Sequence, residues 1–183
     1  MRELTRDSAS EAFRFYAMVE AEILRLTADD GESRAAFLAV CGMTERYKVL
    51  LKMSILQPDG GGMRGGVSDP TPHQLLMIDQ RLDAAANRLK DIEACERVFE
   101  WLDTRTDGQQ VYDGLRAAYM AHPDTPLSHR LVRARITALA AQQARSAADM
   151  PTYRTEIYRR LRRARLRWAQ ERGLVLWEAA EVY

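Results

Sequence analysis

Residues 75–99 read LLMIDQRLDAAANRLKDIEACERVF, and their apolar side chains recur at steps of three and four. This spacing places them on one face of an α-helix, and its persistence along the stretch is typical of a coiled-coil seam. The sequence therefore predicts a long helix that pairs lengthwise, either with other helices of the chain or with a second copy in a homodimer. The seam residues are Leu75, Ile78, Leu82, Ala85, Leu89, Ile92 and Phe99.

The rest of the chain carries the same periodicity in shorter stretches, and no run of β-branched residues predicts a strand. Thr71 with Pro72, and farther on Ser128, stand where residues that cap a helix are expected. Gly173 suits the left-handed position that ends a helix. We expect an all-α fold with helices over about residues 10–26, 33–55, 72–99, 111–119, 128–140 and 151–173. The first helix is expected to bury Ala12, Phe15 or Tyr16, Val19, Ile23 and Leu26, and the last one Ile157, Leu161, Ala164 and Trp168.

Residues 57–72 hold five of the ten glycines of the chain, together with three prolines. Such a segment loses too much backbone entropy to form a helix or a strand, so it is expected to be a linker or a mobile loop. We expect an N-terminal helical bundle over residues 1–104, which contains this glycine-rich linker. A helix-turn-helix-like unit is expected over residues 105–183.

The charged residues are unevenly distributed, although the net charge of the 183 residues is only +1. Residues 79–107 hold eight acidic and five basic side chains, an excess of three negative charges (8 − 5). Residues 151–172 hold eight arginines and two glutamates, an excess of six positive charges (8 − 2). The positive charge is thus concentrated on the last expected helix.

No group of residues has the spacing of a catalytic or metal-binding centre. The three histidines lie next to prolines or a capping serine, with no cysteine or carboxylate at ligand spacing. Cys41 and Cys95 fall among apolar neighbours, where a small buried side chain is the usual interpretation. We expect no enzymatic activity, no bound metal and no cofactor. The histidines are His73, His122 and His129.

The sequence also indicates a cellular compartment. No apolar run approaches the roughly 18 residues that a membrane-spanning helix requires. The first residues lack the apolar core of a secretory signal. We therefore expect a cytoplasmic protein with no membrane partner.

The arginine-rich last helix is the strongest candidate for a binding site. Guanidinium groups keep their charge and bind phosphate in a forked geometry, which suits a DNA backbone. We expect the arginines of this helix to face outward, namely Arg154, Arg159, Arg160, Arg162, Arg163, Arg165 and Arg167. We assign phosphate contacts to Arg145, Arg154, Arg159, Arg163 and Arg167. Base contacts are assigned to the end of the helix that reaches base edges in a helix-turn-helix, at Tyr153, Arg154, Thr155 and Tyr158. The alternative is a solvated face that pairs with the acidic helix at residues 79–107.

Two short segments carry a family resemblance. Residues 153–164, YRTEIYRRLRRA, resemble the recognition helix of phage-encoded regulators of the RinA/ArpU type, which are similar to region 4 of sigma-70 factors. Residues 61–71, GGMRGGVSDPT, resemble the glycine-rich segment that separates two helical parts in those proteins. Glu156 departs from the pattern, which has threonine at that position. The resemblance implies a transcription regulator of phage or prophage genes that binds promoter DNA, with RNA polymerase as a possible second partner.

Sequence-selective binding of double-stranded DNA for transcriptional control is therefore the leading hypothesis. The alternative is a structural or assembly bundle, such as a phage packaging or adaptor component, whose arginine-rich helix binds an acidic protein surface. These two hypotheses predict different partners for the same arginines.

Overall fold

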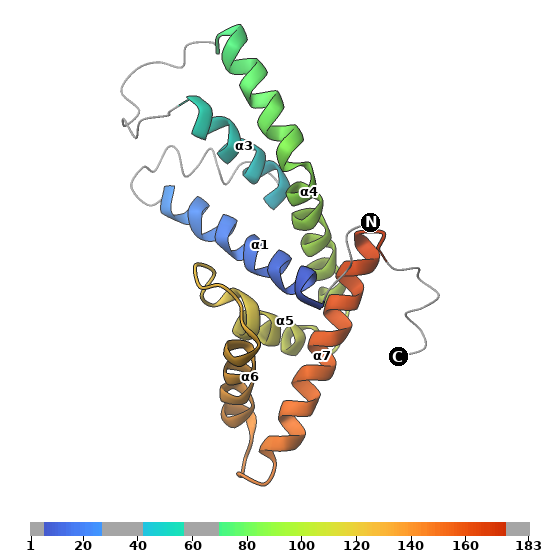
Figure 1. Cartoon of the computed structure of the whole chain (residues 1–183). Helices are drawn as coiled ribbons and strands as arrows, with labels where there is room; N and C mark the ends of the chain where they lie inside the picture. The colour runs from blue at the N-terminus through green and yellow to red at the C-terminus, as the bar shows by residue number, and fades with distance from the viewer. Residues whose placement is uncertain (1–5, 27–41, 57–69, 175–183) are drawn as a thin grey trace. The chain divides into compact units, whose positions relative to one another are not determined.

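The computed structural model describes residues 6–26, 42–56 and 70–174 (Figure 1). Every regular element in these ranges is helical, which confirms the all-α class, and no strand occurs within them. One element is a π-helical turn, η1, which continues directly from α5. The elements are α1 (Arg6–Leu26), α3 (Met43–Leu56), α4 (Pro72–Asp103), α5 (Gly108–Leu115), η1 (Arg116–Met120), α6 (His129–Gln143) and α7 (Met150–Glu171).

The residues expected to start and stop helices do so in the structure. The hydroxyl of Thr71 accepts a hydrogen bond from the amide of Gln74, whose side chain accepts one from the amide of Thr71, so the two form a capping box at α4. The hydroxyl of Ser128 accepts from the amide of Leu131 at 3.2 Å and caps α6. Gly173 has φ 66° and follows the last turn of α7. Local sequence therefore determines where these three helices begin or end.

The chain divides into two compact units. The first contains Met1–Glu20 and Asp91–Tyr183, and the second contains Ala21–Lys90, so the division falls within α1 and within α4. The expected boundary at residue 104 lies inside the first unit. Most of the expected glycine-rich linker, residues 57–69, lies outside the described residues, as do residues 33–41 of the second expected helix.

The core of the first unit receives at least one fully buried apolar side chain from each of its helices. Removing a side chain of this size from water stabilises the folded state by roughly 1.5–3 kcal/mol. A shared core of this kind fixes α7 against α5 and α6, and so positions the arginines of α7. The contributing residues include Phe13 of α1, Val98 of α4, Leu115 of α5, Ile136 of α6 and Leu161 of α7.

An aromatic cluster in this core corrects one expectation about the first helix. The buried aromatic residue of α1 is Phe13, with no exposed surface, whereas Tyr16 is half-buried. The ring of Phe13 lies 6.0 Å from that of Phe99 and 6.5 Å from that of Tyr119, centroid to centroid. Burial, followed by the nearby carboxylate of Glu96, raises the pKa of Tyr16 well above its ordinary value. Ala12, Val19 and Ile23 are buried as expected, so the periodicity identified the apolar face of α1 but not its buried aromatic residue.

The second unit contains the first half of the seam expected on α4. Ile78 and Ala85 are buried and Leu82 is half-buried, whereas Leu75, in the first turn, remains 49% exposed. The guanidinium of Arg81 donates a hydrogen bond of 2.6 Å to the Ser54 hydroxyl and so links α4 to α3. The seam therefore becomes buried only after the first turn of α4.

Cys95 is buried, as expected, and is a free cysteine among the described residues. Burial raises the pKa of its thiol well above the ordinary value. Cys41 lies outside the described residues. His73, His122 and His129 are all exposed. None of the described helices combines the length and the apolar character that crossing a bilayer requires.

Candidate nucleic-acid interface

α6 and α7 follow each other in the order that a helix-turn-helix requires, joined by residues 144–149 (Figure 1). The connection is closed locally, because the Ser146 hydroxyl donates a hydrogen bond of 2.8 Å to the carboxylate of Asp149, which precedes α7. On the other side of α6, the Arg135 guanidinium donates to the Ala118 carbonyl in η1 at 3.1 Å. One contact thus closes the connection before α7 locally, and the other joins α6 to η1.

The apolar stripe expected on α7 is confirmed. Its four members are at most 2% exposed, and all belong to the core of the first unit. The indole Nε1 of Trp168 donates a hydrogen bond to the Asp91 carbonyl of α4 at 3.3 Å. The stripe consists of Ile157, Leu161, Ala164 and Trp168.

The expectation that the arginines of α7 face outward is wrong for most of them. Arg159 and Arg162 are exposed, whereas the others are half-buried beside the apolar stripe. Long arginine stems cover apolar surface in this way while their charged ends remain near water. The half-buried set is Arg154, Arg160, Arg163, Arg165 and Arg167.

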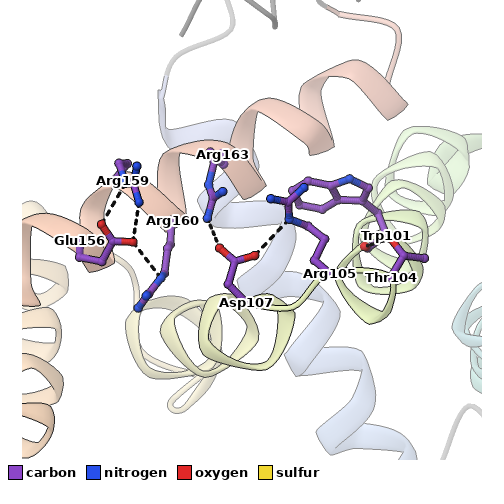
Figure 2. Close-up of polar contacts among 8 residues, drawn as sticks. All are labelled: Trp101, Thr104, Arg105, Asp107, Glu156, Arg159, Arg160 and Arg163. Carbon is purple, nitrogen blue, oxygen red and sulfur yellow. Dashed lines mark hydrogen bonds and ion pairs between the residues drawn. The ribbon is translucent and has the colours of Figure 1, made fainter.

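One side of α7, which we call the α5 side, carries a series of ion pairs (Figure 2). The Arg163 guanidinium contacts the carboxylate of Asp107, the residue that precedes α5, and Arg105 Nε lies 3.1 Å from the same carboxylate. Hydrogen bonding from Arg163, followed by that from Arg105, holds the pKa of Asp107 below its usual range. Two arginines thus share one carboxylate at the packing surface between α5 and α7.

The α5 side continues toward the C-terminal end of α7. Arg167 Nη2 lies 2.5 Å from Glu171 Oε1, and the Arg167 guanidinium lies 5.7 Å from the centre of the Trp101 ring. Arg172 Nε donates a hydrogen bond of 2.7 Å to Asp91 Oδ1. Because these charges already have carboxylate or aromatic partners, a phosphate would have to compete for them.

Glu156 organises the N-terminal part of the same side. Arg159 donates two hydrogen bonds to its carboxylate, at 2.9 and 2.8 Å, and Arg160 Nε lies 3.2 Å away at ion-pair distance without hydrogen-bond geometry. The hydrogen bonds from Arg159 lower the pKa of Glu156, and the same contact raises the pKa of Arg159. The glutamate at the position where the resembled family has threonine therefore neutralises part of the local charge.

The residues assigned to base contacts differ in their surroundings. Tyr153 is half-buried and packs against the core, and Arg154 is half-buried next to it. Thr155 and Tyr158 are exposed, and the Thr155 hydroxyl donates to the Pro151 carbonyl at 3.0 Å. Arg145 is exposed in the turn before α7. Thr155, Tyr158 and Arg159 thus share the solvent-facing surface of α7.

α7 has a second positive side, which we call the α6 side; the sequence assigned its Arg154 and Tyr158 to DNA contacts but not its Arg165 or the neighbouring Arg133. Arg154, Tyr158 and Arg165 follow at steps of four and seven and so share one face of the helix. Arg133 of α6 lines the same pocket as Tyr158 and Arg165. Within the described residues, Arg133, Arg154 and Arg165 have no carboxylate at ion-pair distance. The spacing of Arg154 and Arg165 from Tyr158 could have indicated this side of the helix from the sequence. The position of Arg133 beside Tyr158 and Arg165 follows only from the fold.

Among the residues that the structure describes, no three histidine, cysteine or carboxylate side chains lie together as metal ligands would. Comparisons with protein-family models, with curated proteins and with solved structures find no match to this chain.

Proposed function

We propose that the chain binds double-stranded DNA through α6 and α7 and acts as a sequence-selective transcriptional regulator. The observation that carries the proposal is the division of the arginines around α7. Those on the α5 side hold carboxylates, whereas Arg133, Arg154 and Arg165 on the α6 side have no carboxylate partner among the described residues. A cation without such a partner can bind a DNA phosphate directly, and this binding releases counterions that are condensed on the DNA.

The order of elements supports the same proposal. A helix, a short connection and a second helix that exposes Thr155, Tyr158 and Arg159 provide both polar side chains for base edges and cations for the backbone. In this arrangement the flanking arginines fix the register of the helix on the duplex. Arg145 in the turn and Arg154 are assigned to phosphates on this basis, together with Arg133. Arg163 and Arg167 are assigned to the packing of α7.

The resemblance to phage-encoded RinA/ArpU-type regulators supports the finer proposal of a phage or prophage regulator. RNA polymerase is proposed as a second partner on the same ground. To test the polymerase partner, the full chain bound to promoter DNA is used to pull down purified RNA polymerase. A non-promoter duplex serves as the control.

The main test compares two double variants that each remove two positive charges. Arg133→Gln with Arg154→Gln should lower the magnitude of the log–log slope of affinity against salt by about 2, because each phosphate contact contributes about 0.9. Arg163→Gln with Arg167→Gln should change this slope far less, since these side chains already hold carboxylates. Filter binding of a random-sequence duplex at several salt concentrations measures both.

Since the net charge of the two double variants is equal, a general electrostatic effect cannot separate them. Equal slopes in wild type and in the Arg133 and Arg154 variant would remove the α6 side from the interface. Duplex binding that is weak and indifferent to sequence would instead favour the assembly-bundle alternative. That alternative also predicts that the arginine variants disrupt a complex with an acidic protein.

A further inference from the structure

A pocket of about 250 Å³ lies within the first unit, where α1, η1, α6 and α7 meet. It does not coincide with the ion pairs of the α5 side, and none of the assigned base contacts except Tyr158 lines it. Since one water molecule occupies about 30 Å³ in the liquid, this volume corresponds to roughly eight waters. A pocket of this size fits a small group better than a drug-sized ligand.

The cationic residues of the pocket come from two helices. Arg133 and His129 belong to α6, and Arg165 belongs to α7. Arg165 Nε is buried and has no hydrogen-bond partner within the described part of the chain, a property that it shares with Nε of Arg160, Arg163 and Arg167 on the α5 side. Of these four arginines, only Arg165 lines the pocket.

Hydroxyl groups complete the set of donors. Tyr119 and Tyr158 line the pocket, as does Ser128. The Ser128 oxygen accepts from the Leu131 amide, which leaves its own hydrogen available to donate. Guanidinium and hydroxyl donors around a small pocket are suited to a tetrahedral oxyanion.

The π-helical turn η1, which ends the helix begun by α5, contributes Tyr119 to the pocket. The Ala118 carbonyl in this turn is satisfied by Arg135 from α6. The irregular turn is thus held in place by a specific side-chain contact, next to the pocket.

One carboxylate, Glu11 of α1, also lines the pocket and opposes an anion. Arg14, one turn farther along α1, donates a hydrogen bond of 2.9 Å to Glu11, which offsets part of its charge. The two arginines of the pocket, Arg133 and Arg165, nevertheless outnumber this single acid among the lining residues.

We infer that this pocket binds a phosphate group, held by Arg165 and Arg133. The phosphate comes either from a free phosphoester or from a DNA backbone. The inference goes beyond DNA binding, because a phosphate can occupy the pocket whether or not the chain binds a duplex.

The test uses inorganic phosphate and the full chain, with no DNA present. Phosphorus NMR line broadening and thermal unfolding are followed as sodium phosphate replaces sodium chloride at constant ionic strength. Arg165→Met should weaken phosphate binding by about tenfold or more, since a hydrogen bond to a charged group is worth about 1.5–3 kcal/mol. Glu11→Gln should tighten it, because the opposing charge is removed.

Arg116→Met is the control, since Arg116 is an exposed arginine of η1 that does not line the pocket. It should respond to phosphate as the wild type does. A wild-type response no larger than that to chloride would overturn the inference, and so would an unchanged affinity in folded Arg165→Met. The opposite effect of Glu11→Gln keeps the test decisive if Arg165→Met fails to fold.

A second arm identifies the source of the phosphate. If phosphate weakens duplex binding more than chloride at equal ionic strength, and Arg165→Met abolishes this difference, the DNA backbone occupies the pocket. If phosphate binds and duplex affinity is unaffected, the ligand is a free phosphoester. Loss of DNA binding alone would contradict the proposed function and leave the phosphate measurements intact.

Discussion

Arg163 on α7 and Asp107 before α5 are 56 residues apart in sequence, and their side chains form a direct ion pair. Asp107 occupies the N-cap position of α5 but makes no capping hydrogen bond with its side chain. Its carboxylate instead contacts Arg163 and Arg105. Aspartate at this position usually caps the helix that follows it, whereas the carboxylate of Asp107 joins α7 to the start of α5.

Asp107→Asn should make the stability of the chain less dependent on acid pH. The folded-state pKa of Asp107 is lowered, so its stabilising contribution is present above the unfolded pKa of about 3.9 and is lost as pH falls through the lower folded value. The contribution should be at most about 1 kcal/mol, since both partners are partly exposed. Urea unfolding of both proteins from about pH 6 to below 3 measures it. A stability difference that stays constant over this range would show that the carboxylate charge is not involved.

Two glycines of α5 should respond to alanine with opposite signs. A Cβ at Gly108 would lie 1.9 Å from the Leu102 carbonyl oxygen, so Gly108→Ala should destabilise by on the order of 1–3 kcal/mol. At Gly114 the nearest atom, Leu161 Cδ2, would be 3.5 Å away, which is ordinary contact. Gly114→Ala should stabilise by about 0.5–1 kcal/mol, because alanine loses less backbone entropy in a helix. Chemical denaturation measures the free energy of unfolding of both variants. If this free energy changes with the same sign in both, the packing of α5 is contradicted.

Helix ends and buried stripes were predictable from the sequence because both depend on neighbours within a few residues. Thr71, Ser128 and Gly173 each act on the turn beside them. The stripe of α7 follows from spacing alone. Phe13 was missed because α1 has aromatic residues on more than one face, and periodicity does not select among them.

The acidic stretch at residues 79–107 was one expected partner of the arginine-rich helix, and its Asp91 and Asp107 do pair with Arg172 and Arg163. Which arginine meets which carboxylate could not be predicted in the same way. Glu156 lies within one turn of Arg159 and Arg160, so its ion pairs were open to prediction. Asp107 reaches α7 only because α5 packs there, and Arg133 meets the α6 side only because α6 does. The division of α7 into a paired and an unpaired side is therefore a property of the fold.

The seam on α4 can be tested with a matched pair of leucines. Leu82→Asp places a charge on a half-buried position and should destabilise by about 2 kcal/mol or more. Leu75→Asp changes an exposed side chain and should stay within about 0.5 kcal/mol of wild type. Thermal unfolding measures both, and equal melting temperatures would refute the seam.

The same pair tests the proposed homodimer through this helix. Sedimentation gives the mass of each variant, and a dimer that uses the exposed end of the seam should dissociate in Leu75→Asp without loss of helical content. A monomeric wild type at all concentrations would exclude this homodimer while leaving the seam within the chain intact.

The sharpest prediction for the proposed interface concerns Thr155 and Tyr158, which α7 exposes. Duplexes selected from a random library by the wild type provide the preferred sequence, and affinities for it and for random duplex are then compared at fixed salt. Thr155→Ala or Tyr158→Ala should narrow the ratio of these affinities by about tenfold, because each good base contact discriminates by about 1–3 kcal/mol. The salt slope should stay unchanged, since no phosphate contact is removed.

Thr137→Ala is the control for the threonine. Thr137 on α6 donates its hydroxyl to the carbonyl four residues earlier at 2.9 Å, as Thr155 does on α7 at 3.0 Å, so both substitutions remove the same local hydrogen bond. If both variants narrow the ratio equally, the effect comes from the helix backbone rather than from base contact. If neither Thr155→Ala nor Tyr158→Ala changes the ratio, this surface of α7 does not read sequence. Any selectivity would then have to come from Arg154 or from the shape of the duplex.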